Sequence, residues 1–144
     1  MTKIKLTLGQ YAIIDDSLFG LINQYKWYAR KDCSGYYAVR STKKGTEFLH
    51  WYVIGKPIKG LVTDHINGNT LDNRRINLRI VSQRTNNQNT KNHRAGKLIG
   101  AHWNKKYRKW GASIKIDSKQ EWLGYFSSEI LAHEAYINRL KEAL

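Results

Sequence analysis

The chain has 144 residues, and its 25 Lys and Arg against 11 Asp and Glu give a net charge of +14. Such a surplus on a short chain favours a polyanionic partner, nucleic acid before an anionic membrane. The single cysteine, Cys33, excludes an internal disulfide and a cysteine-rich zinc site. No apolar run approaches the roughly 18 residues that span a bilayer, and the N-terminus lacks a signal-peptide core, so we expect a cytosolic protein without a membrane partner.

Residues 1–60 are predicted to be a β-rich segment. Short aromatic and β-branched runs at Trp27–Arg30 and Tyr36–Ser41 flank the turn cluster Asp32-Cys33-Ser34-Gly35, a pattern typical of a hairpin. A third apolar run, Phe48–Ile54, fits either a strand or a helix and is closed by Gly55 and Pro57. This segment could support a neighbouring small module and add DNA contacts through four basic residues, Lys26, Arg30, Arg40 and Lys43.

Residues 61–93 are predicted to run strand, long ordered loop, strand, helix. The strands are Leu61–Thr63 and Leu78–Val81, and the loop between them is rich in asparagine, glycine and aspartate. Ser82 is a plausible N-cap for a polar helix that starts at Gln83. The link that follows, about residues 90–97, is basic and is expected to be a helix-poor tether.

Residues 98–144 are predicted to form a three-stranded antiparallel sheet packed on one helix, which makes the fold class α+β. The strands are Leu98–Trp103, Trp110–Ile116 and Gln120–Phe126, and Ser127 can cap the helix. In the middle strand Ser113 and Lys115 alternate with apolar residues, so the face away from the helix is expected to be open, polar and basic. The helix presents an apolar stripe at helical spacing: Ala132, Ala135, Tyr136, Leu140 and Ala143.

The central segment holds the groups that phosphodiester cleavage requires. His65 is a candidate general base, since a histidine near neutral pKa can deprotonate water. Asp64 is a candidate metal anchor, with a second oxygen ligand from Asn86 or Asn87 on the helix. Asn77 could hold the loop by bonding its backbone. Neighbouring residues on a regular strand point to opposite faces, so Asp64 and His65 can serve one phosphate only where the strand ends or kinks.

These residues resemble the HNH nuclease motif in its variant with a final asparagine, and the string DHINGNTLDNRRINLR is similar to phage HNH homing endonucleases. Asn77 follows His65 by 12 positions and Asn86 follows Asp64 by 22, which suits the pattern. The resemblance implies a ββα-metal finger in which His65 activates water, Asp64 and Asn86 bind Mg²⁺ or Mn²⁺, and Asn77 braces the loop and orients His65.

Three other histidines are weaker candidates. His50 could contact a phosphate or could equally have a core or surface role. His93 is expected to help tether the chain to DNA rather than to bind a metal. His133, on the C-terminal helix, is expected to face solvent.

Residues 98–144 resemble the AP2 DNA-binding domain. The matching positions are Gly100, Trp110, Ala112, Ile114, Trp122-Leu123-Gly124, Phe126 and Ala135-Tyr136. The resemblance implies a sheet laid in the major groove, where the DNA-facing side chains would be His102, Asn104, Ser113, Lys115, Gln120 and Trp122. Several of these positions are arginine in the plant pattern, so the target sequence is open; Lys105, Lys106, Arg108 and Lys109 would contact phosphates.

The sequence therefore predicts a metal-dependent HNH endonuclease of the homing type that hydrolyses double-stranded DNA. One finger per chain implies that a monomer nicks one strand, and a double-strand break would need a homodimer or two events. A phage-encoded enzyme of this kind would act in the cytoplasm of a bacterial host. The alternatives are a DNA-binding regulator with an inactive finger and, with less support, an RNA-binding or structural basic protein.

Overall fold

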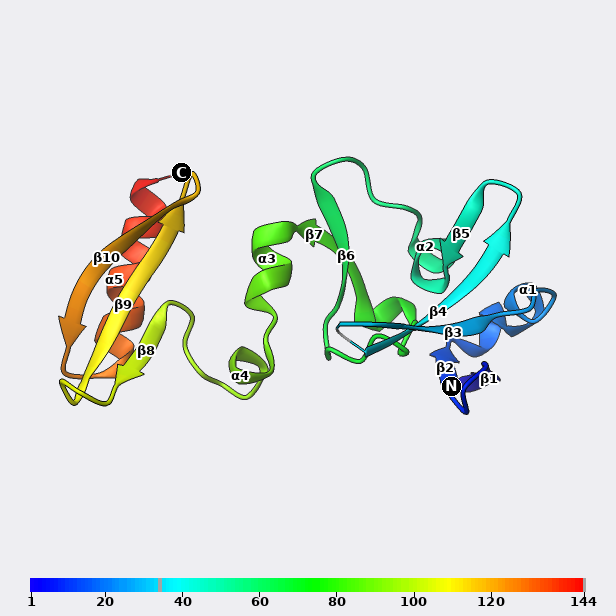
Figure 1. Cartoon of the computed structure of the whole chain (residues 1–144), viewed down its shortest axis with the longest axis horizontal. Helices are drawn as coiled ribbons and strands as arrows, with labels where there is room; N and C mark the ends of the chain where they lie inside the picture. The colour runs from blue at the N-terminus through cyan, green and yellow to red at the C-terminus, as the bar shows by residue number, and fades with distance from the viewer. Residues whose placement is uncertain (34, 144) are drawn as a thin grey trace. The chain divides into compact units, whose positions relative to one another are not determined.

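The structure is a computed structural model that describes residues 1–33 and 35–143 (Figure 1). The chain divides into two compact units, Met1–Thr90 and Lys91–Leu144. Residues 1–60 and 61–90 lie in the first unit, so the predicted boundary at residue 60 does not coincide with the division of the structure, and residues 91–93 of the predicted second segment belong to the second unit. No helix among the described residues is both long enough and apolar enough to cross a membrane.

The first unit is built from short strands and short helices. Two antiparallel strands start it, β1 (Thr2–Lys5) and β2 (Tyr11–Ile14). An antiparallel sheet follows, in the order β3-β4-β5. The last two strands, β6 and β7, form an antiparallel ribbon that runs into helix α3. The remaining bounds are η1 Asp16–Leu18, α1 Phe19–Ile22, β3 Tyr28–Asp32, β4 Gly35–Thr42, β5 Gly45–Phe48, α2 Leu49–Ile54, β6 Leu61–His65, η2 Arg75–Asn77, β7 Leu78–Ser82 and α3 Gln83–Gln88.

The predicted hairpin is present as β3 and β4, although Ser34 of its turn lies outside the described residues. The apolar run that fitted either strand or helix divides between the two. Phe48 ends β5, and α2 begins at Leu49. Gly55 stops the helix because its φ of +87° is a conformation that glycine adopts without steric cost.

One hydrophobic core serves the whole first unit. Ile4, Ile14, Ile22 and Leu49 come from its N-terminal part, and Leu78 joins them from β7. The backbone reinforces this connection, because the Ile13 N–H donates to the Leu71 carbonyl at 2.8 Å and the Ile13 carbonyl accepts from the Asn73 N–H at 2.8 Å. A ribbon and helix of about 30 residues cannot bury a core of their own. The N-terminal segment supplies it.

The second unit is a three-stranded antiparallel sheet covered by one helix, as predicted. Strand order is β10-β9-β8, and Figure 1 shows α5 running along one face of the sheet. Ala112 and Ile114 of β9 and Ala132 and Tyr136 of α5 are buried, which places the core between sheet and helix. The bounds are α4 Lys91–Arg94, β8 Ala101–Asn104, β9 Lys109–Ile116, β10 Lys119–Phe126 and α5 Glu129–Glu142.

Three local predictions for this unit are wrong. Helix α5 is capped by Ser128, whose Oγ accepts from the Leu131 N–H at 3.2 Å, rather than by Ser127. The segment expected to be helix-poor contains the one-turn helix α4. The first strand begins at Ala101 rather than Leu98, because Gly100, with a φ of +82°, breaks the extended backbone before it.

Gly100 is also where the chain passes closest to α5. A Cβ atom built on it would overlap the ring of Tyr136, whereas one on Gly96, which also has a positive φ of +89°, would meet nothing within 4 Å. Glycine is therefore required at position 100 for two reasons, its backbone conformation and the space taken by Tyr136.

We predict that Gly100→Ala destabilises the second unit more than Gly96→Ala does. Both variants carry the strain of a positive φ, about 1 kcal/mol. Only Gly100→Ala adds an overlap with a buried ring, a further cost of about 2 kcal/mol. Thermal unfolding followed through NMR signals of Ala112 and Ile114 measures the difference, and equal losses in the two variants would contradict the close approach to Tyr136.

Candidate active site

The ribbon of β6 and β7 places Asp64 and His65 at its end. Asp64 lies opposite Arg79 and His65 opposite Leu78 in regular antiparallel register. The strand ends directly after His65, where the His65 carbonyl accepts from the Gly68 N–H at 2.7 Å. The strand runs two residues beyond the predicted Leu61–Thr63 and ends at His65, where a shared role for Asp64 and His65 required an end or a kink. The regular pairing up to His65 still directs the two side chains to opposite faces of the ribbon.

The Asp64 carboxylate connects both strands of the ribbon to helix α3. One of its oxygens accepts from Arg79, from Nε at 2.8 Å and from Nη2 at 2.7 Å. The other accepts from the Asn89 amide at 2.7 Å, and the same amide donates to the His65 carbonyl at 2.9 Å. Asp64 is only 4 % exposed, so these partners replace the water that a buried carboxylate loses.

The amide that reaches Asp64 belongs to Asn89 rather than to the expected Asn86. Asn89 is the C-cap residue of α3, and Asn86 lies three residues earlier and is partly buried. Asn89 reaches Asp64 from the C-cap position, Asn86 is partly buried, and Asn87 is exposed. The sequence signal for Asn89 is its place three residues after Asn86, near the end of the predicted helix.

The His65 ring is buried in an aromatic setting, with 6 % of the residue exposed. Its ring lies edge-on to those of His50, at 5.3 Å between centroids, and Tyr37, at 6.2 Å. Burial lowers the pKa of His65, while a hydrogen bond with the Asn73 side chain and the charges of Asp64 and Asp72 oppose that shift. The net effect is a lowered pKa, so the imidazole is neutral at pH 7 and able to accept a proton.

The two ring nitrogens of His65 have different surroundings. Among the described residues Nε2 is buried and has no hydrogen-bond partner. The other nitrogen, Nδ1, is therefore left for Asn73, which is 1 % exposed and whose own Nδ2 donates to the Leu71 carbonyl at 3.0 Å. Asn73 thus orients the ring and leaves Nε2 available. Sequence reasoning assigned this orienting role to Asn77 and missed Asn73.

Asn77 holds the loop between the strands. Its Oδ1 accepts from the Asn67 N–H at 2.9 Å, and its Nδ2 donates to the Asp72 carbonyl at 2.8 Å. The Asp72 side chain, 1 % exposed, accepts from Arg74 at 2.6 and 2.8 Å and from Asn67 at 2.9 Å. The hydrogen bonds from Arg74 are the main cause of the lowered pKa of Asp72. The loop is therefore fixed before any ligand binds.

His50 is a buried residue of α2, at 6 % exposed. Its ring also contacts Phe48, at 5.0 Å between centroids. Burial, and then the charge of His65, lower its pKa to about 3. Of the roles left open by the sequence, the structure gives His50 a place among the aromatic rings that surround His65.

The expectation that His133 faces solvent is wrong. Its Nδ1 lies 2.7 Å from the Ile99 carbonyl, and its ring stacks on that of Tyr136.

We predict that His50 makes the first unit less stable as the pH falls from about 6.5 towards 3. In this window the unfolded chain binds a proton on His50 and the folded chain does not, so protonation favours unfolding, by up to about 1.4 kcal/mol per pH unit. Above the unfolded pKa the effect is absent. Urea unfolding of the wild type and His50→Phe at pH 7.5 and 5, followed through NMR signals of Leu49 and Val53, measures it. The same pH dependence in both proteins would contradict a buried neutral His50.

The side of the second unit's sheet away from α5 carries six of the predicted DNA-facing residues, His102, Asn104, Ser113, Lys115, Gln120 and Trp122. His102 pairs with Gly111 and Trp122 pairs with Ser113, and this strand register places all six side chains on the side away from α5. A Cβ on Gly111 would lie 2.6 Å from the Trp122 ring and 2.7 Å from the His102 ring, so both rings lie over this glycine. Lys105 and Arg108 are exposed in the β8–β9 turn.

This face carries the expected polar and basic residues Ser113, Lys115 and Gln120, but it is also aromatic. Its centre is aromatic, with Trp122 against Tyr125 at 4.8 Å and Tyr125 against Tyr107 at 5.0 Å between centroids. Sequence reasoning missed both tyrosines. The Asn104 amide is also occupied within the turn, since it accepts from the N–H groups of Lys106 and Tyr107 and donates to the Tyr125 hydroxyl.

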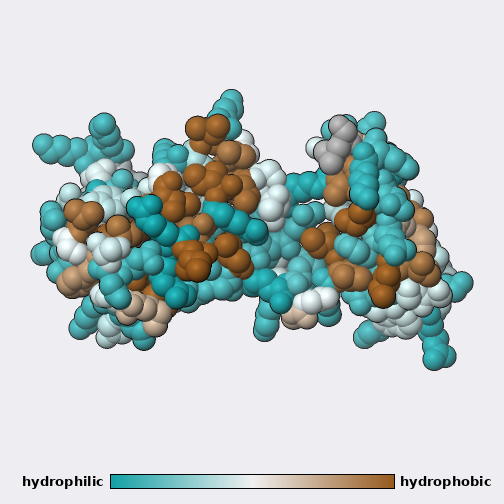
Figure 2. Space-filling view, turned by 180° about the vertical axis from the view of Figure 1, so that it is seen from behind, coloured by the Kyte–Doolittle hydropathy of each residue, from teal (hydrophilic) through white to brown (hydrophobic). Residues whose placement is uncertain are grey.

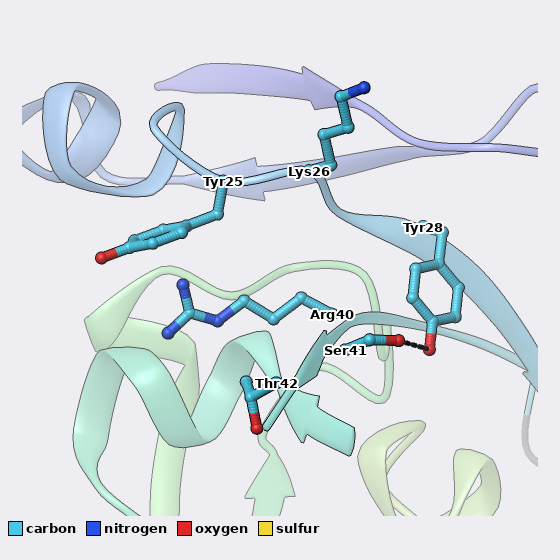
Figure 3. Close-up of a pocket in the computed structure, with 6 residues that line it drawn as sticks. All are labelled: Tyr25, Lys26, Tyr28, Arg40, Ser41 and Thr42. Carbon is cyan, nitrogen blue, oxygen red and sulfur yellow. Dashed lines mark hydrogen bonds between the residues drawn. The ribbon is translucent and has the colours of Figure 1, made fainter. Parts of the chain in front are cut away.

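A cavity of about 550 Å³ in the first unit lies beside Tyr25 and Arg40 (Figure 3). The Arg40 guanidinium sits 3.7 Å from the centre of the Tyr25 ring and its Nε lies 2.6 Å from Glu47. Figure 3 shows the guanidinium extended toward Tyr25, while Tyr28 and Ser41 form a hydrogen bond at the other end. Arg40, suggested as a DNA contact, instead contacts Tyr25 and Glu47 within the first unit.

The donors around Asp64 fit a divalent cation that takes oxygen ligands. They are the Asp64 carboxylate and the His65 carbonyl, both of which the Asn89 Nδ2 contacts, and Asn86 on α3 is a further candidate ligand. The described residues contain no group of three or more His, Cys, Asp or Glu suited to a metal. Mg²⁺ does not require one, since it is commonly held by one or two carboxylates together with water and substrate phosphate.

The segment that carries these residues is similar to a known protein family. The family model described as HNH endonuclease matches residues 53–88, which include Asp64, His65, Asn77 and Asn86. Over 97 residues the chain is 31 % identical to Protein 3.8 of Escherichia phage T7, covering 65 % of this chain and 78 % of that protein. No solved structure matches significantly.

Proposed function

We propose that this chain, which belongs to the family of Protein 3.8 of phage T7 and carries an HNH endonuclease domain over residues 53–88, is a metal-dependent endonuclease that cuts DNA. The observation that carries the proposal is the buried, unpartnered Nε2 of His65 at the end of β6, where the preceding residue, Asp64, accepts from the Asn89 amide at the C-cap of α3. A neutral imidazole with a free nitrogen is a general base, and a carboxylate with amide oxygens is a divalent-metal site.

In this reaction His65 would take a proton from water through Nε2. Asn73 would keep the ring in the tautomer that leaves Nε2 unprotonated, and Asn77 would keep the loop that carries the ring in place. Asp64, Asn86 and Asn89 would hold the divalent cation, Mg²⁺ or Mn²⁺, whose chemistry when bound is to stabilise charge on the phosphate and on the departing 3′ oxygen. Arg79, paired with Asp64, would add positive charge beside the phosphate.

The second unit would provide affinity for double-stranded DNA in the manner of an AP2 domain. Its exposed sheet face would lie in the major groove, with Trp122 and His102 at the centre and Ser113, Lys115 and Gln120 towards one end. Lys105 and Arg108 would contact phosphates, which fixes position without reading sequence. The net charge of +14 supports a partner of this kind.

A single site per chain supports nicking of one DNA strand by a monomer, and a homing role remains part of the proposal by resemblance. The alternative is a DNA-binding regulator that uses the same surfaces without cutting. It differs in one measurable respect, because such a protein would not cut DNA and its function would not depend on Asp64 or His65.

We predict that the wild type nicks supercoiled plasmid DNA in Mg²⁺, that EDTA stops nicking, and that His65→Ala lowers the rate about 100-fold or more, the usual contribution of a general base. His65→Ala should still shift DNA in a gel. Asn87→Ala, an exposed change on α3, is the control and should cut normally. Nicking that survives both EDTA and His65→Ala would refute the assignment.

A further inference from the structure

A second cavity of the first unit lies next to the candidate active site. It has a volume of about 400 Å³ and is lined by α2, by the loop that follows it and by the start of β6. This α2–β6 cleft has a size within the range of about 300–1,000 Å³ found for ligand sites. The lining residues that matter for its chemistry are Tyr37, His50, Trp51, Lys56, Lys59 and Thr63.

The cleft and His65 share the same face of β6. Thr63 precedes His65 by two residues on a regular strand, so the two side chains point the same way. The Thr63 hydroxyl is buried and, like His65 Nε2, has no hydrogen-bond partner among the described residues. His50 connects the two places, since it lines the cleft and its ring contacts that of His65. Two buried polar atoms on one face, both unpaired, indicate a place where a polar ligand completes the structure.

The walls of the cleft combine positive charge with aromatic rings. Lys56 and Lys59 are exposed, and no acidic residue is among the described residues that line the cleft. The Lys56 ammonium lies 5.1 Å from the centre of the Trp51 ring, which in turn contacts Phe48 at 4.5 Å. On the face of the molecule shown in Figure 2, hydrophobic and hydrophilic residues are mixed over each unit rather than separated. Aromatic rings beside lysines are the combination that binds single nucleotides of a strand.

We propose that the α2–β6 cleft binds one nucleotide of the cleaved DNA strand, next to the phosphate that is cut. Lys56 and Lys59 bind the phosphate of that nucleotide. The aromatic side chains that line the cleft contact its sugar and base. The Thr63 hydroxyl hydrogen-bonds the DNA strand where the DNA passes towards His65. This inference rests on the proposed endonuclease function and adds to it the path of the strand.

The test is the double variant Lys56→Ala with Lys59→Ala. Its matched control is Lys3→Ala with Lys31→Ala, which removes two exposed strand lysines of the same unit that do not line the cleft. Binding to a duplex carrying the mapped nick site is measured in EDTA at several salt concentrations. Each phosphate contact contributes about 0.9 to the slope of log affinity against log salt, so we expect the cleft variant to lower the slope by about 2 and the control to leave it unchanged.

A second set of duplexes locates the contact. A neutral methylphosphonate is placed at each phosphate within a few positions of the nick. In the wild type, substitution at one or two neighbouring phosphates should weaken binding about 10-fold, and in the cleft variant the same substitutions should have no further effect, because the lysines they would contact are gone. Lys56→Arg with Lys59→Arg should restore the wild-type response.

The outcomes separate the two proposals. If the wild type does not nick plasmid, the endonuclease function fails and the nucleotide site fails with it. If the wild type nicks but the cleft variant keeps the wild-type salt slope and methylphosphonate response, the function stands and the cleft proposal is wrong.

Discussion

The structure around the candidate site depends on one buried carboxylate. Asp64 accepts hydrogen bonds from Arg79 on one oxygen and from Asn89 on the other, and so ties β6, β7 and α3 together. A charge this deeply buried costs several kcal/mol unless it is paired, and removal of either partner would leave it uncompensated. The carboxylate oxygens that accept these hydrogen bonds are also the oxygens that a cation would bind, in place of the N–H donors.

The N-terminal residues explain how so polar a segment stays ordered. Leu78 anchors β7 in the common core, Ile13 pairs with the loop backbone on both sides, and Asn77 bonds the loop from within. Hydrogen bonds to a loop backbone are worth about 1 kcal/mol each when made and more when a buried partner is left without one. The rest of the first unit therefore holds in place the segment that carries His65 and Asp64, and Arg40, which contacts Tyr25 and Glu47, is part of that framework.

Much of this arrangement follows from the sequence, and the exceptions have physical causes. Alternation along β9 placed Ser113 and Lys115 on the uncovered face, and turn residues located the end of β6. Asn89 was missed because Asn86, Asn87 and Asn89 differ only in their angle around a six-residue helix whose end the sequence does not fix. Tyr107 and Tyr125 were missed because the register shift between Trp122 and Gly124 brings Tyr125 to the same face as Trp122, which simple alternation along the strand does not predict. Ser127 and Ser128 are equally good caps, and only the backbone distinguishes them.

The central claim is that Asp64 and the amides of α3 form one cation site beside His65. Titration of Mn²⁺ into ¹⁵N-labelled protein tests it directly, since the paramagnetic ion broadens the NMR signals of nuclei near it. The account predicts that signals of residues 64–65 and 86–89 broaden first, at low ratios of metal to protein, and that Mg²⁺ competes. Signals of these residues that remain sharp while others broaden would contradict it.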